Sequence, residues 1–218
     1  MLHTMSNRNK AAAAAVDTGE GSARYCDILA AAATLFAERG YHATSIRDIG
    51  ERVGLLGGSL YHHIKSKEAL FVKIHDAALQ QAAEKITQTL APLTCPWGRL
   101  EAACVTLAEL QLDPDSVTMP LMNEFRRLPP ALQEKLIESR DGFEAVFTAL
   151  VNALPLPETI DHKIYRISLL TLLNNLVSWY RPGGLAAGRV AHEIIKIFKP
   201  QNAPGCTEAG CPVCRPAA

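Results

Sequence analysis

Apolar side chains recur along most of this chain at the three- and four-residue spacing that places them on one face of a helix. The first helix is predicted from Ser22 to Arg39, and Gly40 follows it as a helix stop. The apolar positions of this helix are Ile28, Ala32, Leu35 and Phe36. No stretch alternates apolar and polar residues with the period of two that marks a half-buried strand. The predicted fold class is therefore all-α.

Two short helices are predicted next, and a turn that contains Gly54 separates them. Thr44 or Ser45 can cap the first of them, and Asp48 lies near its first turn, where the helix dipole favours negative charge. The second covers residues 57–64. The apolar positions expected to share one small core with the preceding helix are Ile46, Ile49, Val53 and Leu60. Helices of these lengths joined in this way are typical of a helix-turn-helix.

Helical spacing continues through the rest of the chain, with prolines near several of the predicted helix ends. These further helices are predicted over residues 67–90, 97–112, 119–128, 131–154, 160–180 and 185–198. The pattern divides the chain into a flexible N-terminal arm (1–21), a helix-turn-helix domain (22–67), a larger helical domain (68–200) and a tail rich in cysteine and proline (201–218).

The composition changes this picture little. Of 218 residues, 48% are hydrophobic and 20% are charged, which suits a packed core and argues against disorder as the default. The 22 basic residues equal the 22 acidic ones, so the chain has no global basic coat for nucleic acid, although a local basic face is compatible with this balance. No apolar run approaches the roughly 18 residues of a membrane helix. We expect a cytoplasmic protein without a membrane contact, whose six cysteines are thiols or ligands.

The segment G-L-L-G-G-S-L-Y-H-H-I-K-S-K at residues 54–67 carries the candidate chemistry. If its apolar side chains face the core, the polar ones face outward, and they are of types that contact phosphates and bases. The outward set is Arg47, Gly57, Ser59, Tyr61, His62 and Lys67. Gly57 and Gly58 lack side chains where a backbone must approach DNA closely. The beginning of the second short helix is therefore expected to enter the major groove.

Metal binding and nucleotide binding are the alternatives for the same segment. Adjacent helical residues such as His62 and His63 point about 100° apart, and the positions four residues on are Ser66 and Lys67, so a shared metal ion is not predicted. His63 is expected to pack inward. The glycines lack the G-K-[ST] that a phosphate-binding loop requires. No nucleophile, base and orienting acid can be placed together, so we predict that the protein is not an enzyme and carries no cofactor.

The run T-S-I-R-D-I-G-E-R-V-G-L-L-G-G-S-L-Y-H-H-I-K-S-K-E-A-L, preceded by L-F-A-E-R-G-Y-H-A-T-S, resembles the DNA-binding module of the tetracycline-repressor (TetR) family over residues 22–71. The resemblance implies phosphate contacts for Thr44, Arg47 and Lys67, with Arg47 able to reach a base. It implies a DNA face formed by Gly58, Ser59, Tyr61 and His62. The sequence departs from the family at Gly50 (usually Ala), Ile64 (usually Phe) and Leu56 (commonly a capping Ser or Thr).

The resemblance further implies a repressor that binds a palindromic operator as a homodimer and is released by a small molecule held in the larger helical domain. The predicted dimer surfaces are residues 143–154 and 160–179, whose apolar positions extend most of the way round the helix. The candidate residues for the ligand pocket are Leu107, Leu110, Met119, Met122, Phe125, Phe143, Phe147 and Trp179. The segment S-W-Y-R-P-G-G at residues 178–184 is similar to one in family members that respond to acyl-CoA thioesters.

Three cysteines lie in the C-terminal tail at C-x4-C-x2-C spacing: Cys206, Cys211 and Cys214. A closed zinc site needs four ligands, and the tail supplies three. Cys26, Cys95, Cys104 or a histidine could add the fourth, but the sequence does not show that any of them lies nearby. A disordered tail with idle thiols is one interpretation, and a metal- or redox-sensing regulator is the alternative.

Overall fold

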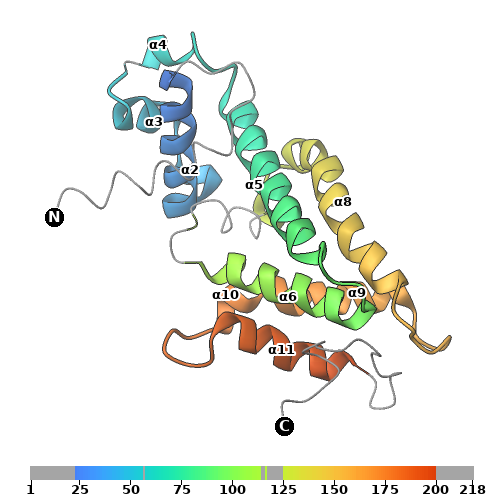
Figure 1. The fold of residues 1–218 in the computed structure, drawn as a ribbon. Helices are drawn as coiled ribbons and strands as arrows, with labels where there is room; N and C mark the ends of the chain where they lie inside the picture. Colours follow the sequence, from blue (N-terminus) through green and yellow to red (C-terminus); the bar gives the residue numbers. More distant parts are fainter. Residues whose placement is uncertain (1–22, 56, 114–115, 117–124, 200–218) are drawn as a thin grey trace. The chain divides into compact units, whose positions relative to one another are not determined.

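The computed structural model describes residues 23–55, 57–113, 116 and 125–199 (Figure 1). Regular structure within these residues is helical throughout, which confirms the all-α prediction. The elements are α2 (Ala23–Ala43), α3 (Ile46–Arg52), α4 (Gly57–Leu60), α5 (Lys67–Leu90), α6 (Pro96–Leu112), η1 (Phe125–Arg127), α8 (Pro130–Asn152), α9 (His162–Asn174), α10 (Leu176–Trp179) and α11 (Ala187–Phe198). The predicted arm (1–21) and tail (201–218), with Cys206, Cys211 and Cys214, lie outside the described residues.

The chain separates into two compact units. Among the described residues, the first contains residues 23–55, 57–81, 116 and 125–140, and the second contains residues 82–113 and 141–199. These units are defined by compactness, and their bounds differ from those of the predicted domains 22–67 and 68–200. The predicted domains divide the chain by expected function, and that division stays a prediction. Within the described residues, no helix combines the length and the apolar character needed to cross a membrane.

The first unit has a core that joins the helix-turn-helix to later parts of the chain. The predicted core positions Ile28, Leu35, Phe36, Ile49 and Leu60 are at most 1% exposed, and Ile46 and Val53 pack against them partly buried. Sequence spacing did not predict that this core also includes residues from α5, from α8 and from the segment just before α8. They include Phe71, Ile74, Leu128, Leu132 and Leu136. The helix-turn-helix is therefore packed on the first turns of α5 and α8.

Helix α2 is interrupted at Gly40, where the sequence predicted a helix stop. The backbone of Gly40 has φ 78° and ψ 166°, and the chain turns helical again up to Ala43. This combination of dihedral angles lies in a region that is essentially restricted to glycine. The kink at Gly40 directs the following residues into the turn that precedes α3.

The single long helix predicted over residues 160–180 is wrong, because the chain divides it at Asn175 into α9 and α10. The Asn175 side-chain amide donates to the carbonyl oxygen of Thr171 (2.8 Å), and the Ser178 hydroxyl donates to the carbonyl oxygen of Asn175 (2.7 Å). Side chains of this type offer the backbone an alternative to continued helical hydrogen bonding. The apolar periodicity alone did not reveal this break.

Candidate nucleic-acid interface

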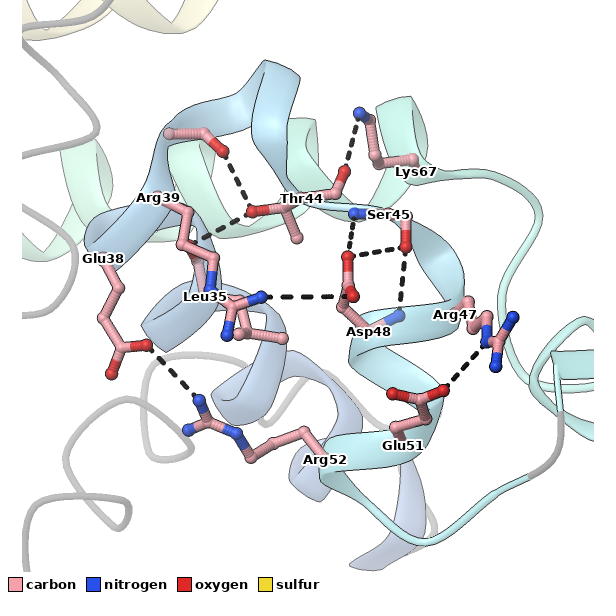
Figure 2. A network of polar contacts seen from close by, with 11 residues as sticks. Leu35, Glu38, Arg39, Thr44, Ser45, Arg47, Asp48, Glu51, Arg52 and Lys67 are labelled. Atoms are coloured by element: carbon pink, nitrogen blue, oxygen red, sulfur yellow. Dashed lines mark hydrogen bonds and ion pairs between the residues drawn. The ribbon is translucent and has the colours of Figure 1, made fainter.

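The turn between α2 and α3 is fixed by a capping box (Figure 2). The Asp48 amide donates to the Ser45 hydroxyl oxygen (3.1 Å), and the Ser45 amide donates to Asp48 Oδ2 (2.7 Å). Of the two cap candidates in the sequence, Thr44 and Ser45, the structure has Ser45 as the N-cap. The hydrogen bonds from the Ser45 side chain and backbone lower the pKa of Asp48, so its carboxylate stays ionised at the positive end of the α3 dipole.

Two ion pairs join α2 to α3 at the same turn (Figure 2). Arg52 Nη2 lies 3.3 Å from Glu38 Oε2, and Arg39 Nη1 lies 4.0 Å from Asp48 Oδ1. These pairs are partly exposed, and exposed ion pairs contribute little to stability individually. The apolar core holds α3 against α2, and these ion pairs help to orient the two helices.

Thr44 is buried, with 1% of its surface exposed. Its hydroxyl donates to the carbonyl oxygens of Gly40 (2.9 Å) and Leu35 (3.2 Å), as Figure 2 shows. A threonine hydroxyl has a single hydrogen to donate. The side chain is therefore hydrogen-bonded inside the helix-turn-helix. The phosphate contact that the resemblance implied for Thr44 stays a prediction.

Lys67 begins α5 and connects it to the same turn. Its ammonium donates to the carbonyl oxygens of Tyr41 (2.9 Å) and Thr44 (2.9 Å), and it lies 4.2 Å from the centroid of the Tyr41 ring. The Tyr41 hydroxyl in turn donates to Glu68 Oε1 (2.9 Å). Because an ammonium has three hydrogens, Lys67 keeps one for the phosphate that the sequence assigns to it.

Arg47 projects from α3 with 85% of its side chain exposed. Its Nε donates to Glu51 Oε1 at 2.8 Å, one helical turn further on (Figure 2). A pair this exposed to solvent is weak and easily exchanged for another partner. The DNA contact predicted for Arg47 would replace this exposed pair and stays a prediction.

The recognition segment (residues 58–64) buries Leu60 and exposes Tyr61 and His62, as the sequence predicted. Leu60 and Ile64 are 0% and 6% exposed. The residues between and before them that face solvent are Gly58, Ser59, Tyr61 and His62. Tyr61 has 60% of its surface exposed. The predicted DNA face and the predicted core face therefore belong to opposite sides of this segment.

His63 does not pack inward, and that prediction is wrong. The side chain is exposed because α4 ends at Leu60 and residues 61–63 form a turn, in which the His63 amide donates to the Leu60 carbonyl (2.9 Å). The helical angle between His62 and His63 therefore did not apply. Within the described residues, no group of three or more His, Cys, Asp or Glu side chains is arranged to hold a metal ion.

Gly50, the departure from the family's usual alanine, has a steric cause. A Cβ atom at Gly50 would lie 2.9 Å from the carbonyl oxygen of Leu55. The Leu55 amide donates back to the Gly50 carbonyl (2.8 Å), so the turn after α3 folds tightly against this residue. Leu56, the other departure in this turn, lies outside the described residues.

Gly58 provides a test of close DNA approach, because no atom outside its chain neighbours and its own helix backbone lies within 4 Å of the Cβ that an alanine would add. We expect Gly58→Ala to fold normally and to weaken operator binding about tenfold, since the methyl group would occupy space that the DNA needs (about 1.4 kcal/mol). Fluorescence anisotropy with labelled operator measures this. Gly142→Ala, which adds a methyl group to an equally open position on α8, is the matched control. Equal affinities of the two variants would contradict close approach at Gly58.

The candidate ligand-binding residues are only partly brought together. Phe143 and Phe147 lie one turn apart on α8 with ring centroids 5.7 Å apart, and Phe147 is fully buried. Leu110 is half-buried on α6, whereas Trp179 is 49% exposed. Phe125 belongs to the first compact unit and packs against the core of that unit. The Arg140 guanidinium lies 4.4 Å from the centroid of the Phe125 ring. Met119 and Met122 lie outside the described residues.

A kinked helix, a capped second helix and a short third segment with a buried face and an exposed polar face define a helix-turn-helix DNA-binding regulator. The family model for bacterial regulatory proteins of the tetR family matches residues 28–74, and a tetracyclin repressor-like C-terminal domain matches residues 94–199. The chain belongs to the TetR family. Its relatives are transcriptional regulators, which confirms that the protein is not an enzyme.

The similarity extends over most of the chain. It is 33% identical over 187 residues to the HTH-type transcriptional repressor KstR2 of Rhodococcus jostii (strain RHA1), covering 83% of this chain and 92% of that repressor. The solved structure of the ketosteroid transcriptional regulator KstR2 of Mycobacterium tuberculosis superposes with a TM-score of 0.65 at 25% identity, covering 83% of this chain and 95% of the other. A structure of AibR in complex with isovaleryl coenzyme A and operator DNA shares the fold, with a TM-score of 0.71, 22% identity and coverage of 80% and 97%.

Proposed function

We propose that this protein is a ligand-responsive repressor that binds a palindromic operator as a homodimer. The observation that carries the proposal is the recognition segment, where Leu60 and Ile64 are buried in the core while Tyr61 and His62 face solvent. Exposed aromatic and polar side chains on a rigidly anchored segment are suited to base edges in the major groove. The similarity to the KstR2 repressors supports the same role.

In this proposal, Ser59, Tyr61 and His62 contact bases, while Gly57 and Gly58 let the backbone approach the duplex. Arg47 and Lys67 contact phosphates on either side. The phosphate contacts set register and salt dependence, and the base contacts set sequence preference. The experiment is selection from a random duplex library with purified protein. We expect enrichment of a sequence with two-fold symmetry whose half-sites are one helical turn, or a multiple of it, apart. An enriched sequence without symmetry would contradict the dimer.

The proposed dimer surface lies on α9 and α10. Ile164, Ile167 and Val177 are 60%, 42% and 51% exposed, and Leu169 and Leu173 of the same segment are fully buried. One side of this segment thus packs in its own unit, and the other presents large apolar side chains to solvent. Such a surface is typical of an interaction site. In a two-fold dimer each of these residues would appear twice, once from each chain.

Ile164→Glu is expected to convert the dimer to monomer, because two unpaired carboxylates would be buried in one symmetric interface. We expect the dimer dissociation constant, measured by sedimentation equilibrium, to rise by roughly 100-fold or more (about 3 kcal/mol). Ile137→Glu changes an isoleucine of comparable exposure (47%) on α8 and serves as the control. If both variants dimerise like the unchanged protein, α9 does not form the interface.

The proposed effector is a small hydrophobic molecule or an acyl-CoA thioester. The KstR2 of M. tuberculosis is a ketosteroid transcriptional regulator, and AibR was solved with isovaleryl coenzyme A. Leu110, Phe143, Phe147 and Trp179 remain proposed contacts for the effector, together with Met119, Met122 and Phe125. An effector releases the operator only if it binds the non-DNA-binding arrangement more tightly than the DNA-binding one.

A further inference from the structure

His75 is a buried polar side chain that the proposed DNA contacts do not use. It lies on α5 with 0% of its surface exposed, and neither ring nitrogen has a hydrogen-bond partner among the described residues. The next residue is Asp76, whose Oδ1 lies 3.9 Å from His75 Nδ1 and is itself buried without a hydrogen-bond partner among the described residues. A separation of 3.9 Å is too long for a hydrogen bond. Both ring nitrogens of His75 and one carboxylate oxygen of Asp76 are therefore left without a hydrogen-bond partner next to each other, among the described residues.

An unsatisfied buried imidazole is unusual. Buried polar groups in folded proteins are almost always hydrogen-bonded, and those that are not commonly mark a functional site. A leucine at position 75 would fill similar space without this loss. A histidine at this position is explained if its ring nitrogens acquire a partner that is a bound molecule.

The position of His75 connects such a molecule to the helix-turn-helix. The His75 ring lies 6.2 Å from the ring of Phe71, one turn earlier on α5. Phe71 contacts Phe36 and Tyr41 edge-on, at 5.2 and 5.1 Å between centroids. Tyr41 is also the residue whose carbonyl accepts a hydrogen bond from Lys67. A displacement of the imidazole would therefore reach the turn before α3 through side chains already in contact.

We propose that His75 donates a hydrogen bond to a carbonyl oxygen of an apolar effector. This inference rests on the proposed function, because it assigns a contact for the ligand of that repressor. Two features of the site favour a neutral carbonyl over an anionic group. A charged ligand group would lose its hydration at a fully buried position, and the Asp76 carboxylate beside His75 would repel it. A steroid ketone and an acyl thioester both carry such an oxygen.

The first test needs no ligand. His75→Leu removes the unsatisfied nitrogens, whereas His75→Gln keeps an N–H donor, and leucine and glutamine have similar helix propensities. We expect the leucine variant to unfold at a temperature about 3 °C or more above that of the unchanged protein, and the glutamine variant to gain less. A leucine variant that unfolds at a lower temperature would show that His75 is a satisfied structural residue, and would overturn the inference.

The second test uses two probes, androst-4-ene-3,17-dione for the ketone and isovaleryl coenzyme A for the thioester. Calorimetric titration should show that at least one binds the unchanged protein. Its dissociation constant should rise about tenfold in His75→Leu and stay within about threefold in His75→Gln. The probe that binds identifies the source of the carbonyl. Equal affinity for the unchanged and leucine proteins, or no binding of either probe, would overturn the inference.

Operator binding without probe separates this inference from the proposed function. His75 is buried and is not one of the proposed DNA contacts, so all three proteins should bind the selected operator. Failure of the unchanged protein to prefer the operator over other DNA would contradict the repressor itself. Normal operator binding together with indifference to the probes would contradict only the role of His75.

Discussion

Replacement of Tyr61 by alanine is expected to lower operator affinity by about 10- to 100-fold, which corresponds to roughly 1–3 kcal/mol for one well-formed contact with the DNA. Tyr61 is 60% exposed, while its neighbour Leu60 is fully buried and fixes the backbone beneath it. An exposed side chain away from special features changes stability by less than about 0.5 kcal/mol when it is replaced. The loss should therefore appear in binding and not in folding.

Tyr61→Phe is the matched variant, because it keeps the ring and removes the hydroxyl. If Tyr61→Phe binds the operator with an affinity between those of the unchanged protein and Tyr61→Ala, both the ring and the hydroxyl of Tyr61 contribute to binding. Anisotropy titrations should be made at one salt concentration, since phosphate contacts make affinity strongly salt-dependent. Unchanged affinity of Tyr61→Ala, with an unchanged denaturation curve, would remove Tyr61 from the DNA face.

Gly40→Ala is expected to destabilise the protein by about 1–3 kcal/mol, the usual cost of holding a residue in a sparsely populated backbone region. At φ 78° and ψ 166°, Gly40 occupies a conformation that a Cβ atom strongly disfavours. Its carbonyl oxygen also accepts the Thr44 hydroxyl, so relaxation of the strain would disturb the turn that Lys67 contacts. Operator affinity should fall together with stability.

Urea denaturation measures the first part of this expectation. Gly142→Ala is again the control, because Gly142 lies within α8 and does not have a positive φ. Alanine is favoured over glycine in a helix interior by up to about 1 kcal/mol, so that variant should be as stable as the unchanged protein or more so. A Gly40→Ala protein that matches it would mean that the kink at Gly40 is not constrained.

Local patterns predicted much of the helix-turn-helix. The spacing of Ile49 and Leu60 placed both in the core, where they are fully buried. The preference of serine and aspartate for helix N-termini located the cap at Ser45 within one residue. Gly40 was expected to stop the first helix because glycine tolerates the conformation that it adopts. These features depend on neighbouring residues, and the sequence contains them directly.

The predictions that failed depend on tertiary contacts or on the exact end of an element. His63 faces solvent because α4 ends at Leu60, and element ends are poorly determined by periodicity. The single helix predicted over residues 160–180 is divided at Asn175, where side-chain hydrogen bonds to the backbone are not visible in apolar periodicity. His75 had no signal in the sequence, because a histidine within a helical pattern is equally compatible with a hydrogen-bonded position.

The most direct test of sequence-specific DNA binding is the affinity of the purified protein for its selected operator relative to a scrambled duplex of equal length and charge. At physiological salt, sequence-specific regulators prefer their sites by about 10³-fold or more. We predict a ratio of that size for the unchanged protein and a smaller ratio for Tyr61→Ala. A ratio near one for the unchanged protein, with binding that salt abolishes equally on both duplexes, would contradict the assignment of residues 44–67 as a sequence-reading module.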